Sequence, residues 1–123
     1  MLSGLRVLIV ESEAIIAMDV QRAVEEAQAR ETVFATSFGQ LAGDVDGFGR
    51  FDLAIVTPLK PGAPDWFVLE KLLAARPAIV VSAADPLPPD HPLKSRAEII
   101  YKPFLDEELL EACRRALANR GAR

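Results

Sequence analysis

Short runs of aliphatic, mostly β-branched residues alternate along this chain with longer segments in which apolar residues recur at helical spacing. Parallel strands need a crossover between them, which is usually a helix, so this alternation favours an α/β fold with helices on both faces of a parallel sheet. The runs are apolar throughout, as expected for strands that are buried on both faces. Five strands are therefore predicted, at residues 6–10, 32–35, 53–56, 78–81 and 98–101.

The segments between these runs differ in how clearly they indicate a helix. Helices are expected at residues 13–29 and 37–47, between Pro64 and Pro77, and from Asp106 onward. Ser12 is the candidate N-cap of the first helix. Three glycines lower the helix propensity of the second, so its limits are uncertain by several residues.

The segment at residues 85–92 breaks the alternation, because it holds four prolines in seven positions and an ordinary helix cannot form there. The fourth helix of the fold is therefore expected to be short or replaced by a proline-rich loop. Such a loop either closes the fold or presents a rigid segment to a partner. His91 lies within it and is expected to be exposed to solvent, with no second histidine in the chain to help hold a metal.

Length and charge narrow the class of protein. The 123 residues suit a single domain spanning 1–123, and no run of 18 or more apolar residues indicates a membrane span or signal peptide. The net charge of −4 argues against binding of nucleic acid, and we expect a cytoplasmic protein. The single cysteine, Cys113, falls on the apolar stripe of the last helix and is expected to be buried.

Polar residues follow the predicted strands at the edge where parallel sheets bind their ligands, beyond the carboxyl ends of the strands. They are Glu11 and Ser12 after the first strand, Thr57 after the third, Ser82 after the fourth and Lys102 after the fifth. These residues form the candidate site.

The segment from Val7 to Glu13 with the helix after it resembles the opening of bacterial response-regulator receiver domains, and Lys102-Pro103-Phe104 resembles their final motif. Asp52 to Val56 matches their third strand and Pro61-Gly62 the loop beyond it. The resemblance implies a flavodoxin-like, doubly wound (βα)5 fold. The proline-rich loop is similar to that of a group of stand-alone receivers in which the fourth helix is reduced.

The family's phosphoacceptor is an aspartate, which binds Mg²⁺ together with two acidic residues after the first strand. By position, Thr57 replaces this aspartate, Ser12 replaces one acidic ligand, and Glu11 retains the other. We therefore expect weak or absent Mg²⁺ binding, no cofactor and no catalytic residue. A shifted register would offer Asp52 or Asp65 as the acceptor, but the first precedes its strand and the second opens a helix.

The remaining positions of the family's switch are also altered or lack their ligand. Ser82 matches the hydroxyl residue that binds the phosphoryl group, and without phosphate its hydroxyl is expected to bind a neighbouring loop backbone. Ile99 stands where an aromatic switch residue is usual, and Tyr101 is expected on the opposite face of the strand. Lys102, the partner of the phosphoaspartate in the family, is expected to pair with Glu11, because a buried lysine without a partner is costly.

The resemblance thus implies a receiver-like domain of two-component (phosphorelay) signalling that acts by phosphorylation-independent binding of a protein partner, and not as an enzyme. The partner would be a sensor kinase or another regulator, with a homodimer also possible. By analogy with the family, residues 86–94 and the last helix would form the binding face. The alternatives are a nucleotide- or flavin-binding protein of similar topology, which Glu11-Ser12-Glu13 disfavours, and a hydrolase built on Ser82 or Thr57, for which no activating base is evident.

Overall fold

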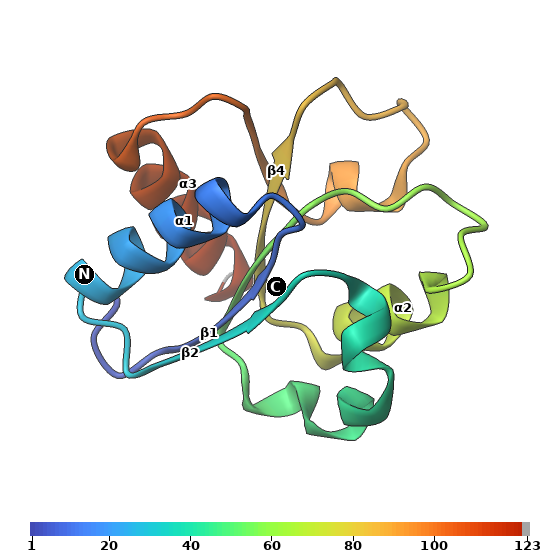
Figure 1. The fold of residues 1–123 in the computed structure, drawn as a ribbon, viewed down its shortest axis with the longest axis horizontal. Helices are drawn as coiled ribbons and strands as arrows, with labels where there is room; N and C mark the ends of the chain where they lie inside the picture. Colours follow the sequence, from blue (N-terminus) through green and yellow to red (C-terminus); the bar gives the residue numbers. More distant parts are fainter. Residues whose placement is uncertain (122–123) are drawn as a thin grey trace.

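A computed structural model describes residues 1–121, so that the last two residues of the expected span 1–123 lie outside the described part (Figure 1). Five parallel strands form one sheet in the order β2-β1-β3-β4-β5. The strands are β1 (Arg6–Val10), β2 (Glu31–Ala35), β3 (Leu53–Val56), β4 (Ala78–Ala83) and β5 (Glu98–Tyr101). This is the predicted doubly wound sheet, with β3 at its centre and β2 and β5 at its edges.

Helices cover both faces of the sheet, as Figure 1 shows. One face packs against α1 (Ala14–Glu26) and α3 (Asp106–Gly121), and the other against the 3₁₀ segment η1 (Phe38–Arg50) and α2 (Trp66–Ala75). Alternate strand residues supply the two halves of the core: Ile9 and Ile55 face α1 and α3, whereas Val10 and Val56 face η1 and α2. The inner strands β1, β3 and β4 are thus buried on both sides, as predicted, whereas the edge strands β2 and β5 keep exposed side chains, among them Phe34 and Tyr101. Cys113 lies in the α1 and α3 half and is buried, which confirms that prediction.

The ends of the first two helices differ from the prediction. The first helix is shorter than residues 13–29, and its N-cap is Glu13, which makes no side-chain cap; the predicted cap Ser12 lies one residue outside. The second predicted helix is a 3₁₀ segment. It is anchored by three buried apolar residues, Phe38, Leu41 and Phe48, while its glycines disfavour a regular α-helix.

The two ends of α2 agree more closely with the prediction. Pro64 lies just before the helix and Asp65 is its N-cap residue. At the other end, Arg76 adopts a left-handed conformation with φ 58° and its N–H bonds to the Leu73 carbonyl, which closes the helix before Pro77.

The proline-rich segment forms only a single 3₁₀ turn, η2 (Pro92–Ser95), in place of a fourth helix, as predicted. Leu87 and Leu93 are buried and fasten this segment to the core. The expectation that His91 is exposed was wrong, because the side chain is 4% exposed. Its Nδ1 accepts the Leu93 N–H at 3.1 Å and its Nε2 lies 2.8 Å from the carbonyl oxygen of Leu59, so the imidazole ties two loops together.

The amino end of the sheet is held by Asp52, which precedes β3. Its carboxylate accepts the backbone N–H of Arg6 at 2.9 Å, and the guanidinium of Arg120 donates to its carbonyl oxygen at 3.2 Å. Asp52 therefore lies at the end of the sheet opposite to the candidate site. Among residues 1–121, no helix has the length and apolar character required to cross a bilayer.

Candidate functional site

Four of the candidate residues lie on one face and at one end of the sheet. Side chains alternate between faces along a strand, so Glu11 shares a face with Ile9, Thr57 with Ile55, Ser82 with Val80 and Lys102 with Ile100. These four strand residues all pack in the α1 and α3 half of the core. The sequence prediction that these strand ends meet is therefore supported by the fold.

Backbone hydrogen bonds fix the strand ends against one another. The Thr57 N–H bonds to the Val10 carbonyl at 3.0 Å, and the Lys102 N–H bonds to the Ala83 carbonyl at 2.9 Å. The parallel hydrogen-bond pattern thus continues one residue beyond the strands, and it fixes the main chain of Thr57 and Lys102 relative to the neighbouring strands.

Glu11 and Lys102 form a largely buried ion pair, as the sequence analysis predicted. The Lys102 Nζ lies 3.0 Å from Glu11 Oε1 and 3.2 Å from Oε2. Glu11 is 3% exposed, so its carboxylate is almost removed from water and depends on its partner for charge compensation. The two charges neutralise each other at the end of β1 and β5.

Glu13 completes this ion pair from the start of α1. Its backbone N–H donates to Glu11 Oε2 at 3.1 Å, while its own exposed carboxylate lies 3.8 Å from Lys102 Nζ. The sequence analysis did not predict the bond between the Glu13 main chain and Glu11, because no side-chain pattern indicates a bond that a backbone N–H donates. With this bond, both carboxylate oxygens of Glu11 are engaged.

Ser12 and Thr57, the two positions that lack a carboxylate, stay outside this network. Ser12 is exposed and Thr57 is half-buried, and neither hydroxyl makes a hydrogen bond within residues 1–121. The structure therefore brings Glu11 and Lys102 together but leaves these two side chains as neutral neighbours.

Ser82 differs from the prediction in its hydrogen bonding. It is 2% exposed, yet its Oγ has no hydrogen-bond partner within the described residues, so the expected bond to a loop backbone is absent. The side chain lies on the same face of the sheet as Val80, in the α1 and α3 half of the core. A buried, unpaired hydroxyl is energetically costly.

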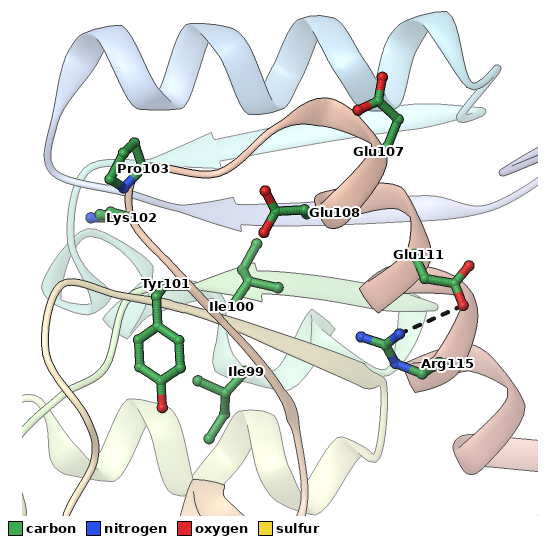
Figure 2. A pocket seen from close by; sticks show the side chains of 9 residues that line it. All are labelled: Ile99, Ile100, Tyr101, Lys102, Pro103, Glu107, Glu108, Glu111 and Arg115. Carbon is green, nitrogen blue, oxygen red and sulfur yellow. Dashed lines mark ion pairs between the residues drawn. The ribbon is translucent and has the colours of Figure 1, made fainter.

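The position of Tyr101 also corrects the sequence analysis. Residues two apart in a strand share a face, so Tyr101 lies on the same face of β5 as Ile99 and not on the opposite one. Figure 2 shows both side chains on one side of β5, away from the acidic residues of α3. Ile99 packs against the η1 and α2 half of the core, whereas Tyr101 is 46% exposed.

The donor set does not fit Mg²⁺. No group of three or more His, Cys, Asp or Glu residues is placed to hold a metal ion among residues 1–121. Mg²⁺ requires several hard oxygen ligands in octahedral geometry, and the one buried carboxylate, Glu11, already binds Lys102 and the Glu13 N–H.

A hollow of about 390 Å³ lies beside Lys102, between α1 and the loop that leads into α3. Three carboxylate residues, Glu13, Asp19 and Asp106, line it, and Thr57 and Ser82 do not. The open space next to the ion pair is therefore separate from Thr57 and Ser82, and two of its carboxylates, Asp19 and Asp106, pair with Arg22.

The sequence analysis did not predict that His91 anchors its loop. It also did not predict the groove between β5 and α3 that Glu107, Glu108 and Glu111 line. His91 is flanked by Leu87 and Leu93, two apolar residues in a loop, and this pattern is the signal that the loop packs inward. The groove depends on the placement of α3 beside an edge strand, which no local pattern reports.

No protein-family model matches the sequence, and no curated protein shows significant sequence similarity to it. Solved structures do match over almost the whole chain. A response regulator receiver protein of Sinorhizobium medicae is 19% identical with a TM-score of 0.74, covering 98% of this chain and 99% of its own. A CheY-like response regulator receiver domain of Methanospirillum hungatei is 23% identical with a TM-score of 0.69, covering 96% and 98%.

An orphan response regulator of H. pylori is 17% identical with a TM-score of 0.69, covering 94% of this chain and 98% of the other. At these identities the likeness concerns the fold. The strand order, the helices on both faces and the coverage agree, and the chain therefore has the flavodoxin-like fold of response-regulator receiver domains.

Proposed function

We propose that this chain is a receiver-like protein of two-component signalling that has lost phosphoryl transfer and acts by binding a protein partner. The observation that carries the proposal is the Glu11–Lys102 ion pair beside Thr57, at the end of the central strand. The receiver reaction needs a carboxylate nucleophile at position 57 and oxygen ligands for Mg²⁺. The chain offers a neutral hydroxyl at that position, and its one buried carboxylate is bound to a lysine.

Thr57 is a poor substitute for the aspartate. A hydroxyl becomes a nucleophile only when a base takes its proton, and the two buried bases among residues 1–121, His91 and Glu11, are engaged in other contacts. His91 is fixed between Leu59 and Leu93, and Glu11 is held by Lys102 and the Glu13 N–H. In this proposal, Thr57 stands at the position of the acceptor aspartate and takes part in no reaction.

Ile99 gives independent support to the loss of the phosphorylation switch. In a receiver that binds phosphate, the hydroxyl at the position of Ser82 has a phosphoryl oxygen to bind. Here the hydroxyl is buried with no partner within residues 1–121, and Ile99 replaces the aromatic residue of the switch. The aromatic residue that would convert phosphorylation into a change of shape is thus missing, whereas the hydroxyl residue is retained.

The acidic surroundings also oppose the alternative of a nucleotide- or flavin-binding protein. Phosphate groups favour the positive end of a helix and backbone N–H donors after the first strand. After the first strand, the Glu13 N–H already donates to the carboxylate of Glu11, and the adjacent hollow is lined by three acidic residues. A sensor kinase or another regulator remains the kind of partner that the fold suggests, and we propose a cytoplasmic location for the pair.

Amide NMR spectra in the presence of Mg²⁺ and beryllofluoride test this proposal, since beryllofluoride mimics the phosphoryl group. We expect no shift at Glu11, Thr57 or Lys102 in the natural chain. A Thr57→Asp, Ser12→Asp double variant is the positive control, because it returns both missing carboxylates. Saturable shifts at the three residues of the natural chain would overturn the proposal.

A further inference from the structure

The strand β5 is an edge of the sheet, with β4 on one side and no strand on the other. The Lys102 N–H points to β4, where it bonds to the Ala83 carbonyl. Backbone groups of successive residues point in opposite directions, so the N–H and C=O groups of Tyr101 and Ile99 point away from the sheet. An edge of this kind is a template for pairing with another extended chain.

The free edge borders a groove of about 700 Å³ between β5 and α3. Glu107, Glu108 and Glu111 of α3 line one side, and Figure 2 shows them across β5 from Tyr101 and Ile99. Pro103 lies at the end of the groove, and because it has no N–H, the row of donors stops there.

Two cations, Lys102 and Arg115, also line this groove, and both are engaged in ion pairs with glutamates other than Glu107 and Glu108. The carboxylates of the groove are therefore only partly compensated. Glu111 pairs with Arg114 and Arg115, but Glu107 has no ion pair within residues 1–121, and Glu108 only accepts the backbone N–H of Leu105. A strand added to β5 would turn alternate side chains toward these carboxylates and the others toward Tyr101 and Ile99. The groove therefore complements an extended segment in which basic and apolar residues alternate.

We propose that the outer edge of β5 binds an extended basic segment of the protein partner by strand addition, with its lysine or arginine side chains facing Glu107 and Glu108. This inference rests on the proposed function, because it names the kind of partner segment that the chain would bind. Charge argues for a different protein over a second copy of this chain. The other free edge, β2, holds no lysine or arginine to face these carboxylates.

In the test, a capped synthetic peptide in which lysine and valine alternate is added to the full chain, and binding is followed by amide NMR of the chain. We expect saturable shifts and slowed hydrogen exchange at the amides of Ile99 and Tyr101. A peptide of alternating glutamate and valine should not bind. The Glu107→Gln, Glu108→Gln double variant should weaken binding about fivefold to tenfold, because it removes two charge pairs while glutamine can still cap Leu105.

Two controls isolate charge and strand pairing. A Glu25→Gln, Glu70→Gln double variant makes the same change in net charge on exposed helix positions that do not line this groove, and should bind as the natural chain does. Peptides N-methylated at every second residue, prepared in both alternations, leave the protein unchanged. One alternation should bind and the other should not, because only one alternation presents its N–H groups to β5.

Equal binding of both N-methylated peptides would overturn strand addition, as would shifts centred away from β5, binding of the glutamate peptide, or no saturable binding at all. Self-association of the free chain through Ile99 and Tyr101 would also overturn it in favour of a second copy. The beryllofluoride experiment is independent of these outcomes. If neither beryllofluoride nor the lysine peptide causes shifts in the spectrum of the chain, the proposed function stands and the strand-addition inference is overturned.

Discussion

The ammonium group of Lys102 lies within 3.2 Å of both carboxylate oxygens of Glu11, although 91 residues separate them in the sequence. Neither residue catalyses a reaction in our account, yet the two hold the ends of β1 and β5 in one charge-neutral contact. Burial explains why both are needed. A charge removed from water requires a partner, and each of these residues is the other's partner.

The first prediction concerns this ion pair. Glu11→Gln should destabilise the chain by about 2–4 kcal/mol, because it leaves the Lys102 ammonium without its main partner in a largely buried position. Lys102→Met should have a similar cost, and the double variant should be clearly more stable than the sum of the two predicts. Urea unfolding of the natural chain, the two single variants and the double variant measures this coupling energy. If the two substitutions changed the free energy of unfolding additively, the residues would have no coupling energy and the prediction would be wrong.

The second prediction concerns Ser82, whose hydroxyl is buried and unpaired. Ser82→Ala should leave stability unchanged or raise it by about 1 kcal/mol, because it removes a polar group that has lost its contacts with water. Thermal unfolding with the natural chain as reference provides the measurement. A loss above about 1 kcal/mol would mean that the hydroxyl has a partner that this account lacks.

The third prediction concerns His91. His91→Phe should destabilise the chain by about 2–4 kcal/mol, since the Leu93 N–H and the Leu59 carbonyl both lose a hydrogen-bond partner. His91→Asn serves as the matched control, because its side-chain oxygen can still accept the Leu93 N–H, and it should cost less. Hydrogen exchange at the Leu93 amide reports the local effect. Equal exchange in all three chains would contradict the anchoring role.

The fourth prediction follows from the burial of Cys113, which raises the pKa of its thiol to about 12 from an ordinary value of 9.0. At neutral pH the native chain should resist alkylation by iodoacetamide, whereas the chain in denaturant should react. A native chain that is alkylated as fast as the unfolded one would place the thiol at the surface.

The same pKa shift predicts a change in stability with pH. The folded-state pKa lies above the unfolded value, so the contribution of the protonated thiol is complete below pH 9.0 and is lost as the pH rises toward 12. The stability difference between the natural chain and Cys113→Ala should therefore shrink above pH 9.0, by at most about 1.4 kcal/mol per pH unit. Unfolding curves at increasing pH measure it, and a constant difference would contradict the shift.

Much of the fold could be predicted because its signals are local. The five apolar runs, the proline-broken fourth helix and the stripe that buries Cys113 are all visible in short stretches of sequence. The Glu11–Lys102 pair was predicted in another way. It came from the resemblance to receiver domains, in which this lysine pairs with the phosphoaspartate, together with the cost of a buried lysine that has no partner.

The features that the sequence did not reveal depend on contacts between distant segments. His91 is buried because Leu59, 32 residues earlier, and Trp66 lie against it, and the composition of its own loop suggested exposure. The 3₁₀ form of η1 reflects glycines that weaken an α-helix while three buried side chains still hold the segment to the core. Ser82 is buried without a hydrogen-bond partner within residues 1–121, although the sequence analysis expected a bond to a loop backbone.

Reaction with a small phosphodonor addresses the central claim most directly. The purified chain would be incubated with Mg²⁺ and acetyl phosphate and its intact mass recorded, beside the Thr57→Asp, Ser12→Asp double variant. We predict no phosphoryl adduct on the natural chain under conditions that yield one on the variant. An adduct on the natural chain that maps to Thr57 would contradict the claim that this receiver fold acts without phosphorylation.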